Sequence, residues 1–408
     1  MTHHHHRYSI CRPRKTLLRL LSAAGVVLTF CCCSPKKTID TTPFGTPVDD
    51  PIGEVVADGR FSLDDIKNNG ELIMLTLSGP ETYYDYRGRG MGLQYLLCQK
   101  FTQQLGVSLR VEVCKDTAEL VRRLTDGEGD IIAYPLSRHI DGLRSCGATT
   151  DSLQTQWAVS ADNSELAQKL DDWFRPELVA EVRQEENFAF SAQSVTRRVY
   201  SPMLDRKGGI ISHYDHFFKR YAPQARWDWR LMAAQCYQES TFDPNARSWA
   251  GACGLMQIMP STAAHLGLPQ SQIFDAEKNI AAAAKYISEL TTHFTDVPGT
   301  QERTLFVLAA YNGGFFHIRD AMALAAKHGR NPHRWADVSP YVLKLREPAY
   351  YNDPVVKHGF MRGDETVDYV QKIRQRWNQY RGVAKGSVSD TAPDMEPKKA
   401  KKAHRFTL

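Results

Sequence analysis

The sequence predicts a multidomain protein in which a small α/β domain is followed by a mainly α-helical domain. Three observations support this prediction. The 408 residues exceed what one hydrophobic core usually organises, so two folded units are expected. Apolar runs with strand and helix periodicity alternate over residues 61–190. From residue 191 onward the apolar pattern is helical, and no strand pattern of comparable strength occurs.

The first 33 residues have the organisation of an export signal. A basic segment that ends at "RPRKT" precedes the apolar stretch "LLRLLSAAGVVLTF", which is too short to span a bilayer comfortably. The run "CCCSPKK" follows, and a cysteine directly after such a stretch is the usual acceptor of a lipoprotein anchor. Cleavage before Cys33 leaves a small residue at the preceding position, so Cys33 is the predicted anchor and Cys31 the alternative. A cleaved soluble signal or a weak anchor helix is the competing interpretation.

A lipid anchor would hold the protein in the cell envelope. The expected location is the outer membrane, with the protein facing the periplasm.

The net charge argues against nucleic acid as a partner. The formal charge is +5, but five of the 51 basic side chains lie in residues 1–33, which contain no acid. The remaining basic side chains equal the 46 acidic ones in number, so the body has no broad positive field for phosphate backbones.

Residues 34–60 are rich in Pro, Thr, Asp and Gly, which predicts a flexible tether, and the α/β domain is expected over residues 61–190. "YRGRGMG" at 86–92 is predicted to be a plain turn. In chain order, the domain is expected to contain a strand in 71–79, a helix in 91–106, a strand in 107–114, a helix in 116–129 and a strand in 130–136. This alternation predicts a small parallel sheet.

Five cysteines follow the leader, at positions 98, 114, 146, 236 and 253. Their odd number and the absence of CxxC spacing argue against a zinc site. One disulfide, Cys98 with Cys114 or Cys236 with Cys253, and buried free thiols are both compatible with the sequence.

The segment 91–136, "MGLQYLLCQKFTQQLGVSLRVEVCKDTAELVRRLTDGEGDIIAYPL", resembles the first lobe of a periplasmic solute-binding protein of the amino-acid-binding type. In that fold two α/β lobes close on a ligand. "QWAVSADNSELAQKLDDWF" resembles the final strand and helix of the fold, and only about 20 residues precede it after Pro135. A second lobe does not fit there, and no basic side chain matches the arginine that clamps an amino-acid carboxylate. The resemblance therefore implies a truncated regulatory or docking domain, with a muropeptide or a protein as its candidate regulator.

The mainly α-helical domain is expected over residues 191–382, and residues 383–408 are predicted to be a disordered basic tail. Its helices are expected within 213–222, 227–239, 261–266, 276–294, 303–312, 318–329 and 364–380, separated by Pro, Gly and Asn turns.

One glutamate in this half has a position that suits acid catalysis. Asp228 can cap a helix through "WRLMAAQCYQ", which leaves Glu239 near the C-terminal end of that helix. The negative end of the helix dipole and the apolar neighbours both disfavour a carboxylate anion, so the pKa of Glu239 is expected to be raised. A protonated Glu239 could act as a general acid. For this residue alone, a solvated surface glutamate is the alternative.

The neighbouring motifs favour catalysis. "QES", "GLMQIMPSTA", "AAYNGG" and "RGDETVDYV", in this order, resemble the four motifs of the lysozyme-like domain of Slt-type lytic murein transglycosylases, over roughly residues 205–380. The resemblance implies that the partner is a peptidoglycan glycan strand. It also implies cleavage of the β-1,4 bond between N-acetylmuramic acid and N-acetylglucosamine, with formation of 1,6-anhydromuramic ends and without a metal or cofactor.

The resemblance also implies roles for individual residues. Glu239 would be the sole catalytic acid and base, because the 6-hydroxyl of the muramic acid replaces water as the nucleophile. Glu365 would be a ligand contact or a structural partner of Arg362. The substrate-binding residues implied by the motifs are Ser240, Met256, Gln257, Tyr311, Asn312 and Tyr369. Core packing is the alternative for Met256 and Tyr369. Ser240 could instead orient Glu239, and Asn312 could instead hold the loop.

Two alternatives remain open at this point. A muramidase would hydrolyse the same bond with water and would need a second carboxylate, for which Asp243 and Asp275 are the candidates. A wall-binding or solute-sensing lipoprotein without catalytic activity would keep the same fold.

Overall fold

The computed structural model describes residues 61–137, 139–150 and 155–386. They all belong to one compact unit of the chain, Asp58–Leu408. The predicted export signal with Cys31 and Cys33, the tether and most of the basic tail lie outside the described residues. Within the described ranges, no helix is both long enough and apolar enough to span a membrane.

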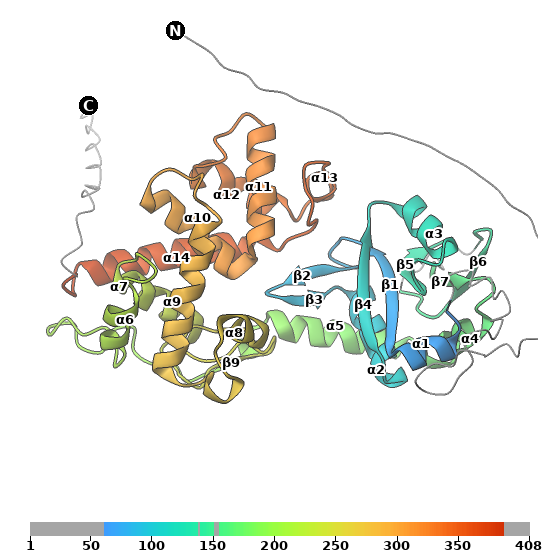
Figure 1. Ribbon diagram of the computed structural model, residues 1–408, viewed down its shortest axis with the longest axis horizontal. Helices are drawn as coiled ribbons and strands as arrows, with labels where there is room; N and C mark the ends of the chain where they lie inside the picture. The colour runs from blue at the N-terminus through green and yellow to red at the C-terminus, as the bar shows by residue number, and fades with distance from the viewer. Residues whose placement is uncertain (1–60, 138, 151–154, 387–408) are drawn as a thin grey trace, which may run out of the picture. The chain divides into compact units, whose positions relative to one another are not determined.

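A five-stranded mixed sheet with strand order β4-β1-β5-β7-β6 forms the centre of the α/β part (Figure 1). The strands are β1 (Glu71–Leu77), β4 (Ser108–Cys114), β5 (Ile131–Leu136), β6 (Leu143–Cys146) and β7 (Gln156–Ser160). β1 pairs in parallel with β4 and β5, as the strand–helix–strand pattern predicts. β7 is antiparallel to β5, and β6 is antiparallel to β7. The predicted parallel sheet is therefore right for three strands and wrong for the sheet as a whole, because the described residues between β5, β6 and β7 include no crossover helix.

Helices cover both faces of this sheet. They are α1 (Leu63–Asn69), α2 (Leu93–Leu105), α3 (Thr117–Thr125), α4 (Ser164–Trp173) and α5 (Glu177–Phe190). Met74, Ile131 and Trp157 point to the face that packs against α1, α2, α4 and α5. The adjacent Leu75 and Ile132 point to the opposite face, against α3. The central strands are buried on both sides, which explains their continuous apolar runs.

Two short strands form a hairpin apart from the main sheet, β2 (Tyr84–Tyr86) and β3 (Arg89–Met91). Its two-residue loop has positive φ at both positions, 54° at Arg87 and 74° at Gly88, as a type I′ hairpin turn requires. The turn expected within 86–92 is confirmed at Arg87 and Gly88, and the two short strands that flank it were not predicted. In Figure 1 the hairpin projects away from the main sheet toward the helices that follow.

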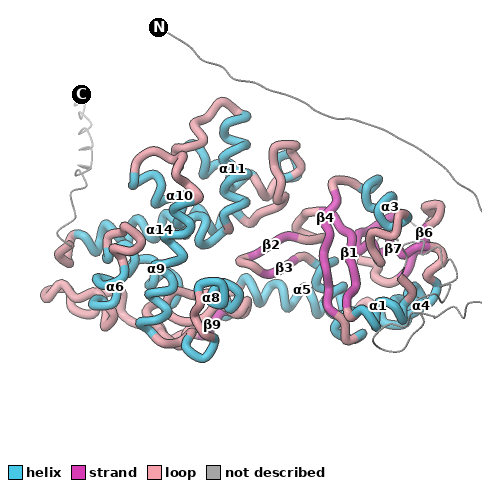
Figure 2. Tube along the Cα trace, in the orientation of Figure 1, coloured by secondary structure: helices cyan, strands magenta, loops and turns pink. Residues whose placement is uncertain are grey.

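The second half of the described chain is mainly helical, as predicted (Figure 2). Its helices are α6 (Asp215–Tyr221), α7 (Trp229–Ser240), α8 (Pro260–Leu266), α9 (Ala276–Thr292), α10 (Thr300–Gly313), α11 (Phe315–Lys327), α12 (Trp335–Lys344), α13 (Pro348–Tyr351) and α14 (Gly363–Arg381). Short 3₁₀ turns lie at Ala192–Ser194 and Gln270–Gln272, and a two-residue ladder joins β8 (Val195–Thr196) to β9 (Arg247–Ser248). The predicted fold class, a small α/β part before a mainly α part, is confirmed.

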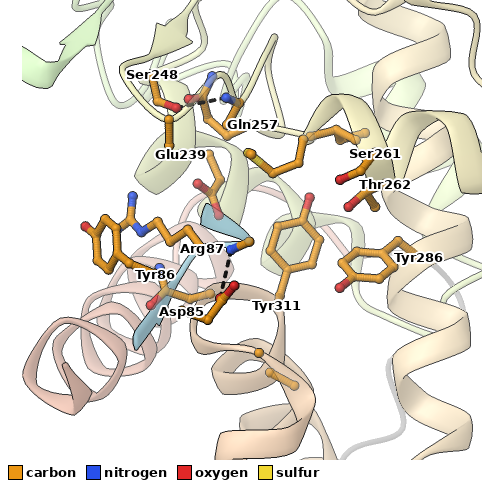
Figure 3. A pocket seen from close by; sticks show the side chains of 18 of the residues that line it. Asp85, Tyr86, Arg87, Glu239, Ser248, Gln257, Ser261, Thr262, Tyr286 and Tyr311 are labelled. Atoms are coloured by element: carbon orange, nitrogen blue, oxygen red, sulfur yellow. Dashed lines mark hydrogen bonds between the residues drawn. The ribbon is translucent and has the colours of Figure 1, made fainter. Parts of the chain in front are cut away.

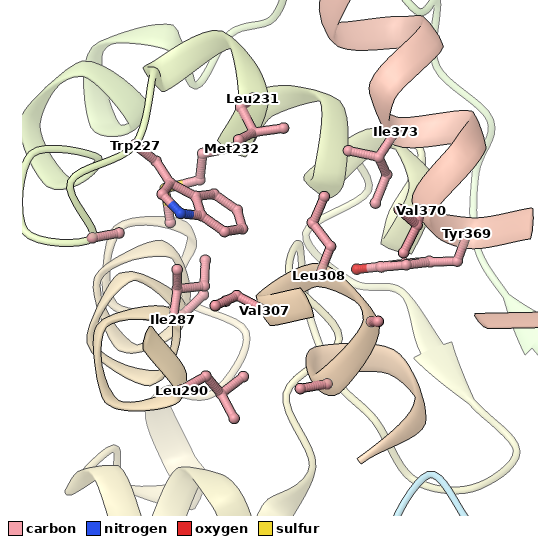
Figure 4. Close-up of a cluster of buried hydrophobic side chains, with 14 of the residues drawn as sticks. Trp227, Leu231, Met232, Ile287, Leu290, Val307, Leu308, Tyr369, Val370 and Ile373 are labelled. Carbon is pink, nitrogen blue, oxygen red and sulfur yellow. The ribbon is translucent and has the colours of Figure 1, made fainter. Parts of the chain in front are cut away.

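The core of the helical part forms around α10. The residues from Phe306 to Ala310 are all buried, so this helix is enclosed on every side and packs against α9, α11 and α14. Figure 4 shows Val307 beside Ile287, and Leu308 facing Val370 and Tyr369 of α14. This packing brings α7 and α14, which are more than 120 residues apart in the sequence, onto one core.

The five described cysteines are all buried free thiols. Neither of the two disulfides considered from the sequence is formed, and the alternative of buried thiols is correct. Cys236 and Cys253 belong to the core of the helical part, where they pack as small apolar side chains.

Candidate active site

The helix that carries Glu239 begins where the sequence predicts. Asp228 is the N-cap of α7, and its Oδ1 accepts a hydrogen bond from the backbone N–H of Arg230 at 2.9 Å. The Asp228 carboxylate also pairs with the Arg230 guanidinium and accepts a hydrogen bond from Trp377 Nε1. The helix ends at Thr241, which is in the left-handed region with φ 54°. Glu239 therefore lies in the last turn of a helix that is fixed at both ends.

Tyr369 and Arg197 donate hydrogen bonds to Glu239. Tyr369 of α14 donates a hydrogen bond from its hydroxyl to Glu239 Oε1 at 2.6 Å, and Gln235 donates to the same hydroxyl. The Arg197 guanidinium donates to the backbone carbonyl of Glu239 at 3.0 Å. The other carboxylate oxygen, Oε2, accepts no hydrogen bond from the described part of the chain. It is therefore free to carry a proton.

Burial raises the pKa of Glu239 to about 7, against the opposing effects of the Tyr369 hydroxyl and the positive charges of Arg87 and Arg197. The raised pKa predicted from the sequence is confirmed. A carboxyl group with such a pKa is partly protonated near neutral pH, so it can donate a proton and later accept one.

Glu239 opens onto a cleft of about 340 Å³, a size within the range of small-ligand sites. Both aromatic and hydroxyl side chains line it, as suits a sugar with apolar ring faces and polar hydroxyls. Those that line the cleft are Tyr86, Trp249, Tyr286, Tyr311, Phe315, Phe316, Ser194, Ser248, Ser261 and Thr262. Figure 3 shows the Glu239 carboxylate beside the side chain of Arg87, with the ring of Tyr311 across from it.

Three of the predicted substrate-binding residues line this cleft: Gln257, Tyr311 and Asn312. Tyr311 donates a hydrogen bond from its hydroxyl to the backbone carbonyl of Met256 and packs against Tyr286. Asn312 Oδ1 accepts a hydrogen bond from Thr366, which ties the end of α10 to α14.

The other three predicted residues lie behind the cleft wall. Ser240 is completely buried, and its hydroxyl donates to the backbone carbonyl of Cys236 instead of facing a ligand. The Met256 side chain is also completely buried, and Met259 lines the cleft in its place. Tyr369 is 4% exposed and contacts Glu239, so it acts through the carboxylate. The structure does not support the expected substrate contacts of Ser240 and Met256, because their side chains point into the core.

The loop that follows α7 is held by a residue that the motifs do not include. Asn279 of α9 accepts a hydrogen bond from Met256 N–H, and its Nδ2 donates to the carbonyls of Cys253 and Ile273. A Cβ on Gly254 would lie 2.6 Å from Asn279 Nδ2, and Gly254 has φ 77°. Close backbone approach is therefore the role of this glycine.

Backbone strain is concentrated around the candidate acid. Among the described residues other than glycine, five have positive φ, and four of these are close to Glu239 in the structure: Thr241 and Phe242 directly after α7, and Arg87 and Gln257 in the cleft. Such conformations persist only where the surrounding structure enforces them, and they are common at functional sites. The hydrogen bonds of Gln257 Nε2 to the carbonyls of Ala246 and Gly254 provide this enforcement.

The tip of the β2–β3 hairpin also lines the cleft, which the sequence interpretation missed. The lining residues from the hairpin are Asp85, Tyr86, Arg87 and Gly88. Tyr86 donates a hydrogen bond to Glu365 Oε2 at 2.6 Å, and Arg362 lies 3.4 Å from Glu365. Glu365 is thus a structural partner of Arg362, one of its two expected roles. The only local signal for the hairpin was the Arg-Gly pair that follows a tyrosine-rich segment.

The second carboxylates considered for a muramidase do not reach the cleft. Asp243 accepts hydrogen bonds from the backbone of Arg198 and Asn245, and Asp275 caps α9. Asp85 is the carboxylate that lines the cleft together with Glu239 in the described part of the chain. Its Oδ1 accepts a hydrogen bond from Gly88 N–H, and burial raises its pKa. Asp85 therefore has a structural function in the hairpin turn.

Comparisons with known proteins agree with the four motifs. Residues 216–333 match the family model of the transglycosylase SLT domain. The chain is 28% identical to the membrane-bound lytic murein transglycosylase F of Desulfosudis oleivorans, over 76% of this chain and 90% of that protein. It is 32% identical to the protein of the same name from Shewanella woodyi, over 65% of this chain and 56% of that protein.

Among solved structures, the 70 kDa soluble lytic transglycosylase of Escherichia coli aligns at 25% identity over 41% of this chain and 24% of that chain, with a TM-score of 0.29. The resemblance inferred from the motifs is confirmed by the family model and by the curated relatives.

Proposed function

We propose that this relative of the lytic murein transglycosylases is itself a lytic transglycosylase of peptidoglycan. It would cleave the β-1,4 bond between N-acetylmuramic acid and N-acetylglucosamine and leave 1,6-anhydromuramic ends. The observation that carries the proposal is Glu239, a carboxyl group with a pKa of about 7 in a sugar-sized cleft, with one oxygen bonded to Tyr369 and the other free. The SLT domain match over residues 216–333 supports the same substrate.

The geometry supports a reaction with one acid and no water. Protonated Glu239 gives its proton to the glycosidic oxygen as the bond from that oxygen to C1 of the muramic acid breaks. The resulting carboxylate then takes the proton of the 6-hydroxyl of the same muramic acid, while the oxygen of this hydroxyl bonds to C1. Atoms and charges balance, and Glu239 returns to its protonated form. Tyr369 keeps Oε1 occupied through both steps, so Oε2 carries the proton each time.

Glu239→Gln tests this assignment. The substitution keeps the size of the side chain but cannot donate a proton to the leaving oxygen. Loss of a sole general acid and base should lower kcat by at least about 10²–10⁴-fold in release of soluble muropeptides from purified sacculi. A matched control is Gln238→Glu, which adds a carboxyl group at the neighbouring position of the same helix without removing Glu239. Residual activity of Glu239→Gln within about tenfold of the wild type would assign the proton transfer to another residue.

A hydrolytic muramidase is the second candidate, because Asp85 shares the cleft with Glu239. An inverting hydrolase would need Asp85 to activate water. In Asp85→Asn, the amide oxygen can still accept the hydrogen bond from Gly88 N–H. We therefore expect this variant to remain active and to form the anhydro product. Loss of activity comparable to that of Glu239→Gln, with the hairpin intact, would favour the muramidase.

We also propose that the protein is lipid-anchored in the cell envelope, in the outer membrane and facing the periplasm. The basic and apolar leader before the cysteine run supports an anchor at Cys33, or at Cys31. The curated relatives are named membrane-bound, which agrees with this location. Replacing the three cysteines (C31S/C32S/C33S) should move the protein from the membrane fraction to the soluble envelope fraction. Continued sedimentation of the triple variant with membranes would contradict a lipid anchor.

A further inference from the structure

The cleft has a wall that belongs to the α/β part of the chain, and this wall is held in place by specific contacts. Tyr86 is hydrogen-bonded to Glu365 and packs edge-on against Phe190 at 5.2 Å. Arg89 stacks on the ring of Trp249 at 4.1 Å. Tyr84 packs against Phe360. These contacts fix the hairpin on both of its strands, so its tip has a defined position against the cleft.

Arg87, at this tip, has hydrogen-bonding capacity that the described residues do not use. It is the one basic side chain among the described residues that line the cleft. It donates a long hydrogen bond from Nη2 to Glu365 at 3.4 Å, and its side chain remains 39% exposed. Glu365 already has Tyr86 and Arg362 as partners. A guanidinium offers five N–H donors, so most of those of Arg87 remain available.

The charge of Arg87 acts on the reaction centre. It is one of the two positive charges that lower the pKa of Glu239 against the effect of burial. A group on the substrate that reaches Arg87 must therefore lie close to the scissile bond.

We propose that Arg87 binds a carboxylate carried on the lactyl arm of the muramic acid whose glycosidic bond is cleaved, so that the α/β part contributes a specificity residue to the active site. This proposal rests on the proposed function. The sugars of a glycan strand are otherwise neutral, and the lactyl arm on O3 belongs to the same ring as the reacting C1. A planar guanidinium is the side chain best suited to bind a carboxylate with two parallel hydrogen bonds.

The carboxylate has two sources. In strands without peptide stems, the lactyl arm ends in a free carboxylate. In strands with stems, the lactyl group is an amide and the carboxylates belong to the peptide. The two sources differ in distance from the ring, so they can be distinguished with substrates that carry only one of them.

The experiment uses the full-length protein with Arg87→Gln and Arg87→Lys. Kd is measured by calorimetry in the Glu239→Gln background, and KM and kcat are measured with Glu239 intact. The ligands are glycan strands stripped of stems by an amidase, strands with stems, and neutral chitin oligomers. Arg144→Gln is the matched control, because Arg144 is an exposed arginine of the same part of the chain on β6.

We expect Arg87→Gln to raise Kd and KM about 10–100-fold for one class of strand, with a smaller change in kcat. A larger loss with stripped strands identifies the lactyl carboxylate, and a larger loss with stem-bearing strands identifies the stem. Arg87→Lys should restore part of the affinity because it retains the charge. Chitin oligomers should bind all variants equally, and Arg144→Gln should behave as the wild type.

Three results would overturn the proposal. Kd within about twofold of the wild-type value for both classes of strand would show that Arg87 binds no carboxylate. An equal loss of affinity for chitin oligomers would show that Arg87 only shapes the wall. An increase in kcat measured well below pH 7, where Glu239 is protonated in every variant, would show that the hairpin obstructs the cleft. Because Kd is measured in the inactive background, these results do not depend on whether the wild type forms anhydro ends.

Discussion

Glu239 combines two features that a sole acid and base requires, a raised pKa and one unoccupied oxygen. Burial raises the pKa. The hydroxyl of Tyr369 binds only Oε1, so Oε2 remains unoccupied. The aspartates of the neighbouring loops are used as caps or turn residues, which leaves Glu239 without a partner carboxylate from the described part of its own half of the chain.

The pH dependence of kcat should report this pKa. The acid step needs protonated Glu239, so activity should be high below about pH 7 and should fall as pH rises through that value. Tyr369→Phe removes a donor that stabilises the carboxylate, and it should therefore raise the pKa of Glu239 and move the alkaline limb to higher pH. Arg87→Gln should move it in the same direction, since Arg87 and Arg197 are the positive charges that face Glu239. A limb that stays in place in both variants would assign the titration to another group.

The residue scale also shows what sequence reasoning could and could not reach. The helix cap at Asp228 and the position of Glu239 follow from local rules, and both are correct. The expected substrate contacts of Ser240 and Met256 came from their places in motifs, and their side chains lie in the core instead. Whether a motif residue faces the cleft or the core depends on packing by α9, α10 and α14, which one segment of sequence does not encode.

At the scale of elements, the loop after α7 has its conformation fixed from a distance. Asn279 is 23 positions beyond Met256 in the sequence, yet it makes three hydrogen bonds to the loop and to the segment before α9, and it is completely buried. No local pattern marks this asparagine. Its role follows only from the packing of α9 beneath the loop.

Asn279→Ala should therefore affect stability and substrate binding together. Loss of the hydrogen bonds and of a buried polar side chain should lower the free energy of unfolding by about 2–4 kcal/mol, and KM should rise because Gln257 loses its support. Denaturant unfolding and muropeptide release measure the two effects. Asn352→Ala, at an exposed asparagine, is the control and should stay within about 0.5 kcal/mol. Equal unfolding free energies for Asn279→Ala and the wild type would refute this account of the loop.

The elements with strong periodicity were predictable, and the exceptions have physical causes. The strands β1, β4 and β5 and the helices α7, α9, α10 and α14 lie where the pattern predicts. α12 was missed because Pro340 lies inside it, a residue that removes a backbone donor and normally ends a helix. The β2–β3 hairpin was missed because its strands are three residues long, and its place at the cleft arises from tertiary contacts.

At the scale of the whole described chain, the helical part covers the edge of the sheet where α/β folds bind ligands. Ser78 follows β1 at its carboxyl end, and its hydroxyl accepts a hydrogen bond from the backbone N–H of Phe360 at 2.9 Å. Phe360 is 6% exposed and belongs to the hydrophobic core of the α/β part, where it packs against Tyr84 and Tyr351. Phe360 thus occupies the position at this edge where a small solute would bind.

We therefore expect the full-length protein to bind no free amino acid with a micromolar Kd. Calorimetry with a panel of amino acids should give no heat of binding, and titration with purified muropeptides should report only the cleft that contains Glu239. Arg87→Gln provides the comparison, since it should weaken the muropeptide signal alone. An amino acid that binds in the micromolar range would show that the edge near Ser78 opens to a ligand.

The central claim is that the 6-hydroxyl of the substrate, and not water, attacks the glycosidic carbon while Glu239 carries the proton. Digestion of purified sacculi in oxygen-18 water, followed by mass spectrometry of the released muropeptides, tests this directly. The account predicts products that end in 1,6-anhydromuramic acid, lighter by one water than reducing ends and without heavy oxygen. Products with reducing muramic acid ends that carry one heavy oxygen atom would contradict it and establish a hydrolase.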